Sequence, residues 1–256
     1  MQIELNYKVF GEGFPVIILH GLFGTLDNWQ TISRQLGEYY KVYVPDQRNH
    51  GKSPHTEAFS YPILADDVAH FMDSHQIIKA IIIGHSMGGK AAMQFAWTYP
   101  GRVEKLVVLD IAPKAYHGGQ ERIINTLLGI DLEKVGDRKE VESQMMETIP
   151  EFGVRQFLLK NLTRNENNGK LEWKMNLSVL SREIHKIMSE IDSGVFSGPT
   201  LFVRGDQSDY IIDSDIPVMR EGFPKMRLET VQNAGHWLHA EQPRVLMELL
   251  LEFLQK

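Results

Sequence analysis

Short apolar runs alternate with longer stretches of helical periodicity along most of this chain. Residues 3–10 alternate apolar and polar positions, which predicts an edge strand. Further strands are predicted at the short apolar runs of residues 16–19, 42–44, 80–83, 106–109, 200–203 and 226–231. Helical spacing lies between these runs, at residues 28–37, 61–75, 87–99 and 241–255. Strands that are apolar on both faces and alternate with helices are typical of an α/β protein with a parallel sheet between two helical layers.

The stretch from residue 114 to residue 191 breaks this rhythm. Its apolar residues keep helical spacing, most clearly in residues 180–191, and it contains no good strand. We therefore predict a helical cap over residues 114–191, inserted after the strand that ends near Asp110. The core would then consist of residues 1–113 and 192–256. Helices inserted at the carboxyl edge of such a sheet usually cover the ligand crevice.

Residues 84–88, Gly-His-Ser-Met-Gly, follow a run of isoleucines and open a predicted helix. They match G-x-S-x-G, the sharp strand-to-helix turn that presents a nucleophilic serine, here Ser86. A phosphate-binding loop over residues 84–91 is the alternative, since a glycine and Lys90 stand at the required positions. That alternative lacks the hydroxyl that holds Mg²⁺, because Ala91 follows the lysine.

Two distant segments favour the serine turn. His20-Gly21 follows the second predicted strand, where a loop that donates an oxyanion-binding N–H is expected. His236 lies between the last strand and the closing helix, so it can reach Ser86 across the carboxyl edge of the sheet. A serine, then an acid, then a histidine is the chain order of α/β hydrolases. We predict that fold, with Ser86 as nucleophile and His236 as general base.

The acid that orients His236 has three candidates in the residue pattern. Most α/β hydrolases place it after the penultimate strand, three positions past a glycine, but that position is Ser208 here. Asp206 and Asp209 flank Ser208, and Asp110 stands at the end of an earlier strand. The pattern alone leaves these three open.

Several segments resemble the YbfF-type esterases, a branch of the α/β hydrolases that includes mitochondrial relatives. The resemblance covers nearly the whole chain and is carried by residues 20–29, 46–54, 84–90, 110–113, 157–161 and 235–241. Its most specific part is Arg-Asn-His-Gly at residues 48–51, because general α/β hydrolases carry a glycine in place of Asn49. The resemblance implies that the triad acid stands 24 residues after Ser86, at Asp110, with Asp209 as the alternative.

The same resemblance implies hydrolysis of carboxylic esters of short to medium acyl chain, and of thioesters. The tetrahedral intermediate of acyl transfer needs two N–H donors, and we expect these on the backbone of Leu22 and Met87. Phe23 lines the acyl pocket or packs in the core, and His85 supports the serine turn close to the substrate. These two residues are our candidates for substrate binding.

Other functions fit this scaffold. Within enzymes, these are carrier-protein ester hydrolysis and the pyruvate-eliminating synthase step of menaquinone assembly. Arginines that reach the pocket from the cap would favour the synthase, although Lys90 stands where that family would carry arginine. A small-molecule receptor with the hydrolase fold is the non-enzymatic alternative, against which an intact Ser86 and His236 argue.

Composition narrows the classes further. The chain has no cysteine, which excludes a disulfide scaffold, thiolate metal sites and a cysteine nucleophile. Its 27 basic and 33 acidic residues give a net charge of −6, which argues against a nucleic-acid or anionic-membrane partner. No apolar run reaches the ~18–20 residues of a membrane span, and the N-terminus lacks signal-peptide features. We expect a cytoplasmic enzyme that acts on a small-molecule ester without a metal or organic cofactor.

Overall fold

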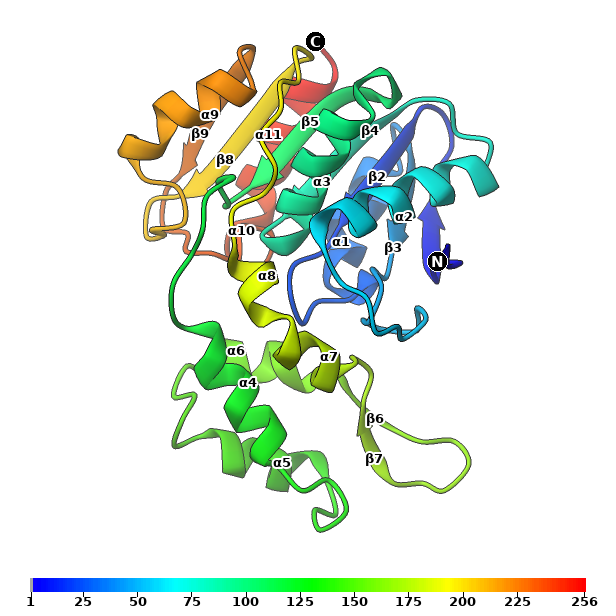
Figure 1. Cartoon of the computed structure of the whole chain (residues 1–256), viewed down its shortest axis with the longest axis vertical. Helices are drawn as coiled ribbons and strands as arrows, with labels where there is room; N and C mark the ends of the chain where they lie inside the picture. The colour runs from blue at the N-terminus through cyan, green and yellow to red at the C-terminus, as the bar shows by residue number, and fades with distance from the viewer. Residues whose placement is uncertain (1) are drawn as a thin grey trace.

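A computed structural model describes residues 2–256 as a seven-stranded sheet flanked by helices, with a further helical group beyond one edge of it (Figure 1). The strands of the sheet are β1 (Tyr7–Phe10), β2 (Pro15–Leu19), β3 (Lys41–Pro45), β4 (Ala80–His85), β5 (Val103–Leu109), β8 (Thr200–Gly205) and β9 (Met226–Val231). Their order is β1-β3-β2-β4-β5-β8-β9, and β1 pairs antiparallel with β3 whereas the other neighbours are parallel. The predicted mostly parallel sheet and its N-terminal edge strand are confirmed.

Helices bury both faces of the sheet. They are α1 (Gln30–Leu36), α2 (Tyr61–Ser74), α3 (Met87–Thr98), α9 (Ile216–Gly222), α10 (Leu238–Glu241) and α11 (Pro243–Leu254), with 3-10 turns η1 (Leu26–Trp29), η2 (Pro100–Arg102) and η3 (Asp213–Asp215). Ile17 and Leu19 of β2 pack with residues of α2 and α3, while Val16 and Ile18 pack with residues of α1 and α11. Because successive side chains of a strand point to opposite faces, a strand buried on both sides must be apolar throughout.

Seven elements lie between β5 and β8. They are α4 (Gln120–Gly129), α5 (Arg138–Met145), α6 (Phe152–Leu159), β6 (Leu162–Arg164), β7 (Leu171–Trp173), α7 (Leu177–Arg182) and α8 (Ile184–Met188). The prediction that this segment contains no strand is wrong, because β6 and β7 form an antiparallel hairpin. Each strand has only three residues, which is too short for an alternating pattern to be recognised. Gly169, between β6 and β7, has φ +70°.

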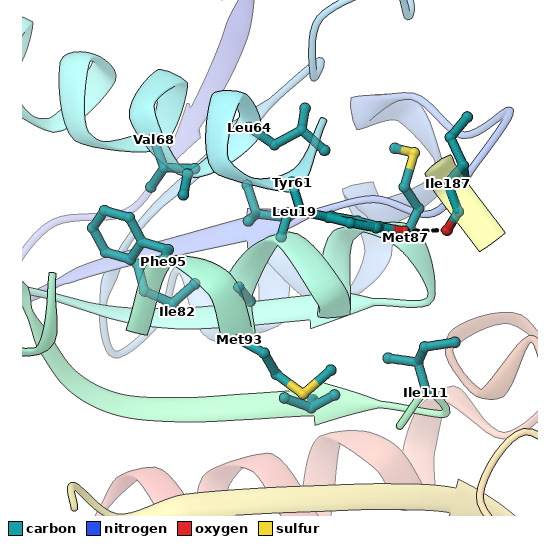
Figure 2. Packing of buried hydrophobic residues seen from close by; sticks show 14 of the residues in the cluster. Leu19, Tyr61, Leu64, Val68, Ile82, Met87, Met93, Phe95, Ile111 and Ile187 are labelled. Atoms are coloured by element: carbon teal, nitrogen blue, oxygen red, sulfur yellow. Dashed lines mark hydrogen bonds between the residues drawn. The ribbon is translucent and has the colours of Figure 1, made fainter. Parts of the chain in front are cut away.

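The segment between β5 and β8 gathers beyond the carboxyl ends of the parallel strands (Figure 1). The core holds its returning end through two side chains. The hydroxyl of Tyr61 in α2 donates to the carbonyl oxygen of Ile187 in α8 at 2.5 Å (Figure 2). The ammonium of Lys90 in α3 donates to the carbonyl oxygen of Ser189, just past α8. We propose that residues 114–191 act as a cap over this edge of the sheet.

Within residues 2–256, no helix is long and apolar enough to span a bilayer.

Candidate active site

Ser86 stands at the bend between β4 and α3. Its backbone has φ +54° and ψ −121°. Residues other than glycine rarely adopt this conformation, and those that do are often found at functional sites. A Cβ atom on Gly84 would meet the carbonyl of Gly88, and one on Gly88 would meet the carbonyl of Leu19. The two glycines therefore permit the close crossing of strand and helix that presents the serine hydroxyl.

Ser86, Asp110 and His236 meet at the carboxyl edge of the sheet. The Nε2 atom of His236 lies 2.9 Å from the Oγ atom of Ser86, and its Nδ1 atom lies 2.8 Å from the Oδ2 atom of Asp110. Because Nδ1 faces a carboxylate, the proton of a neutral imidazole belongs on Nδ1, which leaves Nε2 free to accept from the serine. Asp209, the alternative acid, is exposed and forms no hydrogen bond to His236 in the part of the chain that the structure describes.

The carboxylate of Asp110 is fully buried and has two further donors. The backbone N–H of Gly205 donates to Oδ1 at 3.2 Å, and the hydroxyl of Ser208 donates to Oδ2. Ser208 thus occupies the position at which most α/β hydrolases carry the acid, and here its hydroxyl contacts the carboxylate of Asp110. Such donors replace hydrogen bonds to water that a buried carboxylate has lost, so Ser208 is a site residue that the sequence did not reveal.

Tyr210 is a second site residue without a sequence signal. Its ring stacks on the imidazole of His236, with centroids 3.8 Å apart and planes 17° apart. The hydroxyl of Tyr116 donates to the carbonyl oxygen of Tyr210 at 2.7 Å. The stacked ring restricts the orientation in which His236 can face Ser86 and Asp110.

Two backbone N–H groups next to Ser86 are free to bind an oxyanion. Met87 is the first residue of α3, so its N–H has no partner within the helix. Leu22 lies in a tight turn that is closed by a 2.9 Å hydrogen bond from Gly24 N to Gly21 O. Leu22 and Met87 line one small hollow together with Ser86. Within residues 2–256, neither N–H donates to a protein acceptor.

His85 lies beneath His236. Its Nε2 atom is 2.7 Å from the backbone oxygen of His236, and its side chain is buried. Burial holds the pKa of His85 well below its usual value, so the ring stays neutral and donates from Nε2. It also borders the cavity beside Ser86, as does Phe23, which is buried.

A cavity of about 280 Å³ opens beside Ser86 and His236. Residues of the core and of the segment between β5 and β8 line it, and most of its exposed lining surface is apolar. The apolar side chains include Phe23, Trp29, Val154, Phe157, Leu158 and Trp237. The other lining residues include polar ones. Among them, the Nη2 atom of Arg122 lies 3.7 Å from the Oε1 atom of Glu151. An apolar cavity with a catalytic constellation at one end suits an acyl or alcohol chain.

Lys90 does not face this cavity. Its side chain is buried, with the ammonium 4.8 Å from the ring centre of Tyr116 and 5.6 Å from that of Tyr61. Burial lowers the pKa of Lys90 to about 7. Its hydrogen bond to the carbonyl of Ser189 points it toward the returning chain of the cap segment. The geometry therefore does not place Lys90 as a phosphate-binding lysine. Arg122 does border the cavity from the segment between β5 and β8, but its guanidinium is paired with the carboxylate of Glu151.

Several known proteins resemble this chain over most of its length. A family model described as alpha/beta hydrolase fold matches residues 15–128. The sn-1-specific diacylglycerol lipase ABHD11 of Danio rerio is 36% identical over 99% of this chain and 83% of its own length. Esterase YbfF of Escherichia coli is 34% identical over 94% of this chain and 92% of its own. The solved structure of a marine microorganism esterase is 44% identical, with a TM-score of 0.96 over 98% of this chain and 100% of the other.

Proposed function

This chain belongs to the α/β hydrolase family and, within it, to the YbfF-type esterases, and we propose that it cleaves carboxylic esters through an acyl-enzyme on Ser86. Its relatives support an esterase or lipase activity as the general class. The observation that carries the proposed mechanism is the continuous contact from Ser86 through His236 to Asp110.

In the acylation half of the reaction, the Oγ atom of Ser86 attacks the ester carbonyl. A serine hydroxyl is a weak nucleophile at neutral pH, so His236 accepts its proton at Nε2 as the bond forms. The imidazolium that results is stabilised by the buried carboxylate of Asp110. The negative oxygen of the tetrahedral intermediate binds the N–H groups of Leu22 and Met87.

The intermediate then collapses with loss of the alcohol. His236 gives its proton to the leaving oxygen, and the acyl group remains bonded to Ser86. A water molecule takes the place of the alcohol, and His236 removes its proton as it attacks the acyl carbonyl. Release of the carboxylic acid restores the hydroxyl of Ser86. The cycle uses only groups of this chain and water.

The 280 Å³ cavity supports esters with a short to medium apolar chain as substrates. Its lining is mostly hydrocarbon and aromatic, so each buried methylene contributes about 0.8 kcal/mol until the cavity is full. The name of the ABHD11 relatives refers to the sn-1 ester of a diacylglycerol, which is a carboxylic ester with a bulky alcohol. Short-chain diacylglycerols therefore belong in the substrate panel next to simple esters and thioesters.

The test compares wild-type protein with Ser86→Ala on p-nitrophenyl esters from C2 to C12. Turnover by the wild type that is lost in Ser86→Ala supports the proposal. The chain length at which turnover is highest indicates how long an acyl chain the cavity accepts. Equal rates in the two proteins would overturn it and would favour a receptor that releases p-nitrophenol only by background hydrolysis. Far-UV circular dichroism of both proteins shows that the alanine variant is folded.

A further inference from the structure

The turn that holds the Leu22 N–H has an unusual residue at its third position. Gly21 and Gly24 close the turn, and Phe23 lies between them with φ +60°. Positive φ at the third position is a feature of type II turns, where glycine or asparagine is normally found. A phenylalanine in this conformation is strained, and such strain persists only when the surroundings fix it.

Both backbone polar groups of Phe23 are held by side chains from distant parts of the chain. Its N–H donates to the Nε2 atom of His50 at 3.2 Å. Its carbonyl oxygen accepts from the Nδ2 atom of Asn161 at 2.6 Å, across 138 residues. His50 belongs to the core, whereas Asn161 lies between α6 and β6 in the cap segment. The turn is therefore held from two sides.

His50 is neutral in this position. Burial lowers its pKa to about 3, and its Nδ1 atom lies 2.9 Å from the carbonyl oxygen of Arg48. The tautomer with a proton on Nδ1 donates to Arg48 and leaves Nε2 to accept from Phe23. His50 therefore keeps its hydrogen bond to the Phe23 N–H, and stays uncharged, between neutral and mildly acidic pH.

Asn161 presents its amide from a fixed base. Its backbone N–H donates to Leu158 O at 3.0 Å, and its carbonyl accepts from Lys174 N at 2.8 Å. Its side chain is buried, and within residues 2–256 its Oδ1 atom has no hydrogen-bond partner. A buried amide that leaves its oxygen unpaired is held by its donor group alone, which points at the carbonyl of Phe23.

We propose that Asn161 is a positioning residue for ester hydrolysis, which fixes the Phe23 turn and thereby the direction of the Leu22 N–H. The inference rests on the proposed function, because Leu22 matters only if an oxyanion forms there. The Leu22 N–H and the Phe23 carbonyl flank one turn, so rotation of Phe23 away from φ +60° redirects the donor. The cap thereby completes the oxyanion site as well as lining the cavity.

The test compares Asn161→Ala and Asn161→Leu with Arg182→Gln. The leucine keeps the branched shape of the side chain, but it has no N–H group to donate to the Phe23 carbonyl. Arg182 is the control, because it joins the cap segment to the core through Glu57 without touching the Phe23 turn. For each protein we would measure kcat, KM and the inhibition constant of a trifluoromethyl ketone, which binds as a tetrahedral oxyanion on the serine.

A misplaced donor weakens transition-state binding more than substrate binding. We expect both Asn161 variants to lose roughly 10- to 100-fold in kcat, less than the ~10²–10³ of a deleted oxyanion donor. The affinity for the trifluoromethyl ketone should fall by a similar factor, whereas KM should stay within about threefold of the wild-type value. Arg182→Gln should stay close to wild type in all three quantities.

Besides unaffected Asn161 variants, two results would overturn the inference. One is a loss confined to KM with unchanged ketone affinity, which indicates only a displaced cavity wall. The other is failure of both Asn161 variants to fold while Arg182→Gln folds, which indicates a purely structural role. Ser86→Ala, assayed in parallel, separates the two proposals. Full turnover in Ser86→Ala defeats the proposed function, whereas an inactive Ser86→Ala next to unaffected Asn161 variants defeats this inference alone.

Discussion

The Nδ1 atom of His236 lies 2.8 Å from the Oδ2 atom of Asp110, although 126 residues separate them in the sequence. The sheet order explains the contact, since Asp110 follows β5 and the strand beside β5 is β8, which in turn adjoins β9. His236 follows β9, so both residues leave the sheet at its carboxyl edge. Their contact fixes the tautomer in which His236 can accept a proton from Ser86.

Asp110→Asn should therefore inactivate the enzyme without unfolding it. An asparagine keeps the shape of the side chain but neither stabilises the imidazolium nor favours the required tautomer, which in serine proteases costs about 10⁴ in kcat. The measurement is kcat on the best p-nitrophenyl ester. Asp209→Asn is the control and should stay within about twofold of wild type. Wild-type rates in Asp110→Asn with loss in Asp209→Asn would reverse the assignment of the acid.

The size of the cavity should control the preferred acyl chain. Val154→Phe adds volume to the wall, so kcat/KM for C10 and C12 esters should fall roughly 10- to 100-fold while C2 is spared. Phe157→Ala removes volume and should move the optimum to longer chains. The measurement is kcat/KM over the C2 to C12 series for both variants. Parallel loss at every chain length would show that the cavity does not hold the chain.

An alanine substitution at a glycine of the serine turn should lower the stability of the fold much more than one at a glycine of the cap segment. In Gly88→Ala, the new Cβ atom would press on the backbone carbonyls of Leu19 and His20, which cannot move aside. We expect a loss of about 1–3 kcal/mol in the free energy of unfolding and a large loss of activity. Gly129→Ala, at the end of α4, meets no atom within 4 Å and should be neutral or stabilise by up to ~1 kcal/mol. Urea denaturation of both variants measures the difference, and equal values would contradict the steric account.

Buried neutral histidines should make the fold sensitive to acid. Burial lowers the pKa of His20 to about 4, and of His50 and His239 to about 3. Below pH 6.5 the unfolded chain binds protons that the folded chain does not, so the free energy of unfolding decreases as the pH falls. Each histidine contributes up to about 1.4 kcal/mol per pH unit between pH 6.5 and its folded pKa.

One variant isolates the contribution of a single histidine. His239 stacks on Trp29, and phenylalanine preserves that contact while it removes the titrating group. His239→Phe should lessen the dependence of the unfolding free energy on pH by about 1.4 kcal/mol per unit between pH 6 and pH 4.5. Urea denaturation at several pH values provides the slopes. Identical slopes for wild type and His239→Phe would contradict a depressed pKa at this position.

The strands, the main helices and the serine turn were predictable because each depends on neighbouring residues. The isoleucines before residue 84 specify a buried strand, and the Gly-x-Ser-x-Gly pattern specifies the bend after it. The hairpin of β6 and β7 has no recognisable pattern in the sequence, because a strand of three residues is too short to show a period. Local pattern thus gave the frame of the site but not the details of the cap segment.

Residues that act through long-range contacts had no local signal. Ser208 sits where an acid is usually found, and only the adjacency of β5 and β8 brings its hydroxyl to Asp110, 98 residues earlier. The amide of Asn161 meets Phe23 only after the cap segment folds onto the core. No periodicity or spacing in the chain encodes such a pair, because its members lie far apart in the sequence with many helices and strands between them.

The central claim is that Ser86 forms the covalent intermediate. A fluorophosphonate probe reacts with an activated serine, and intact-protein and peptide mass spectrometry locate the adduct. We predict one adduct per chain, on the peptide that contains Ser86, together with loss of ester hydrolysis and no labelling of Ser86→Ala. An adduct on another residue, or full hydrolysis by protein labelled at Ser86, would contradict the account.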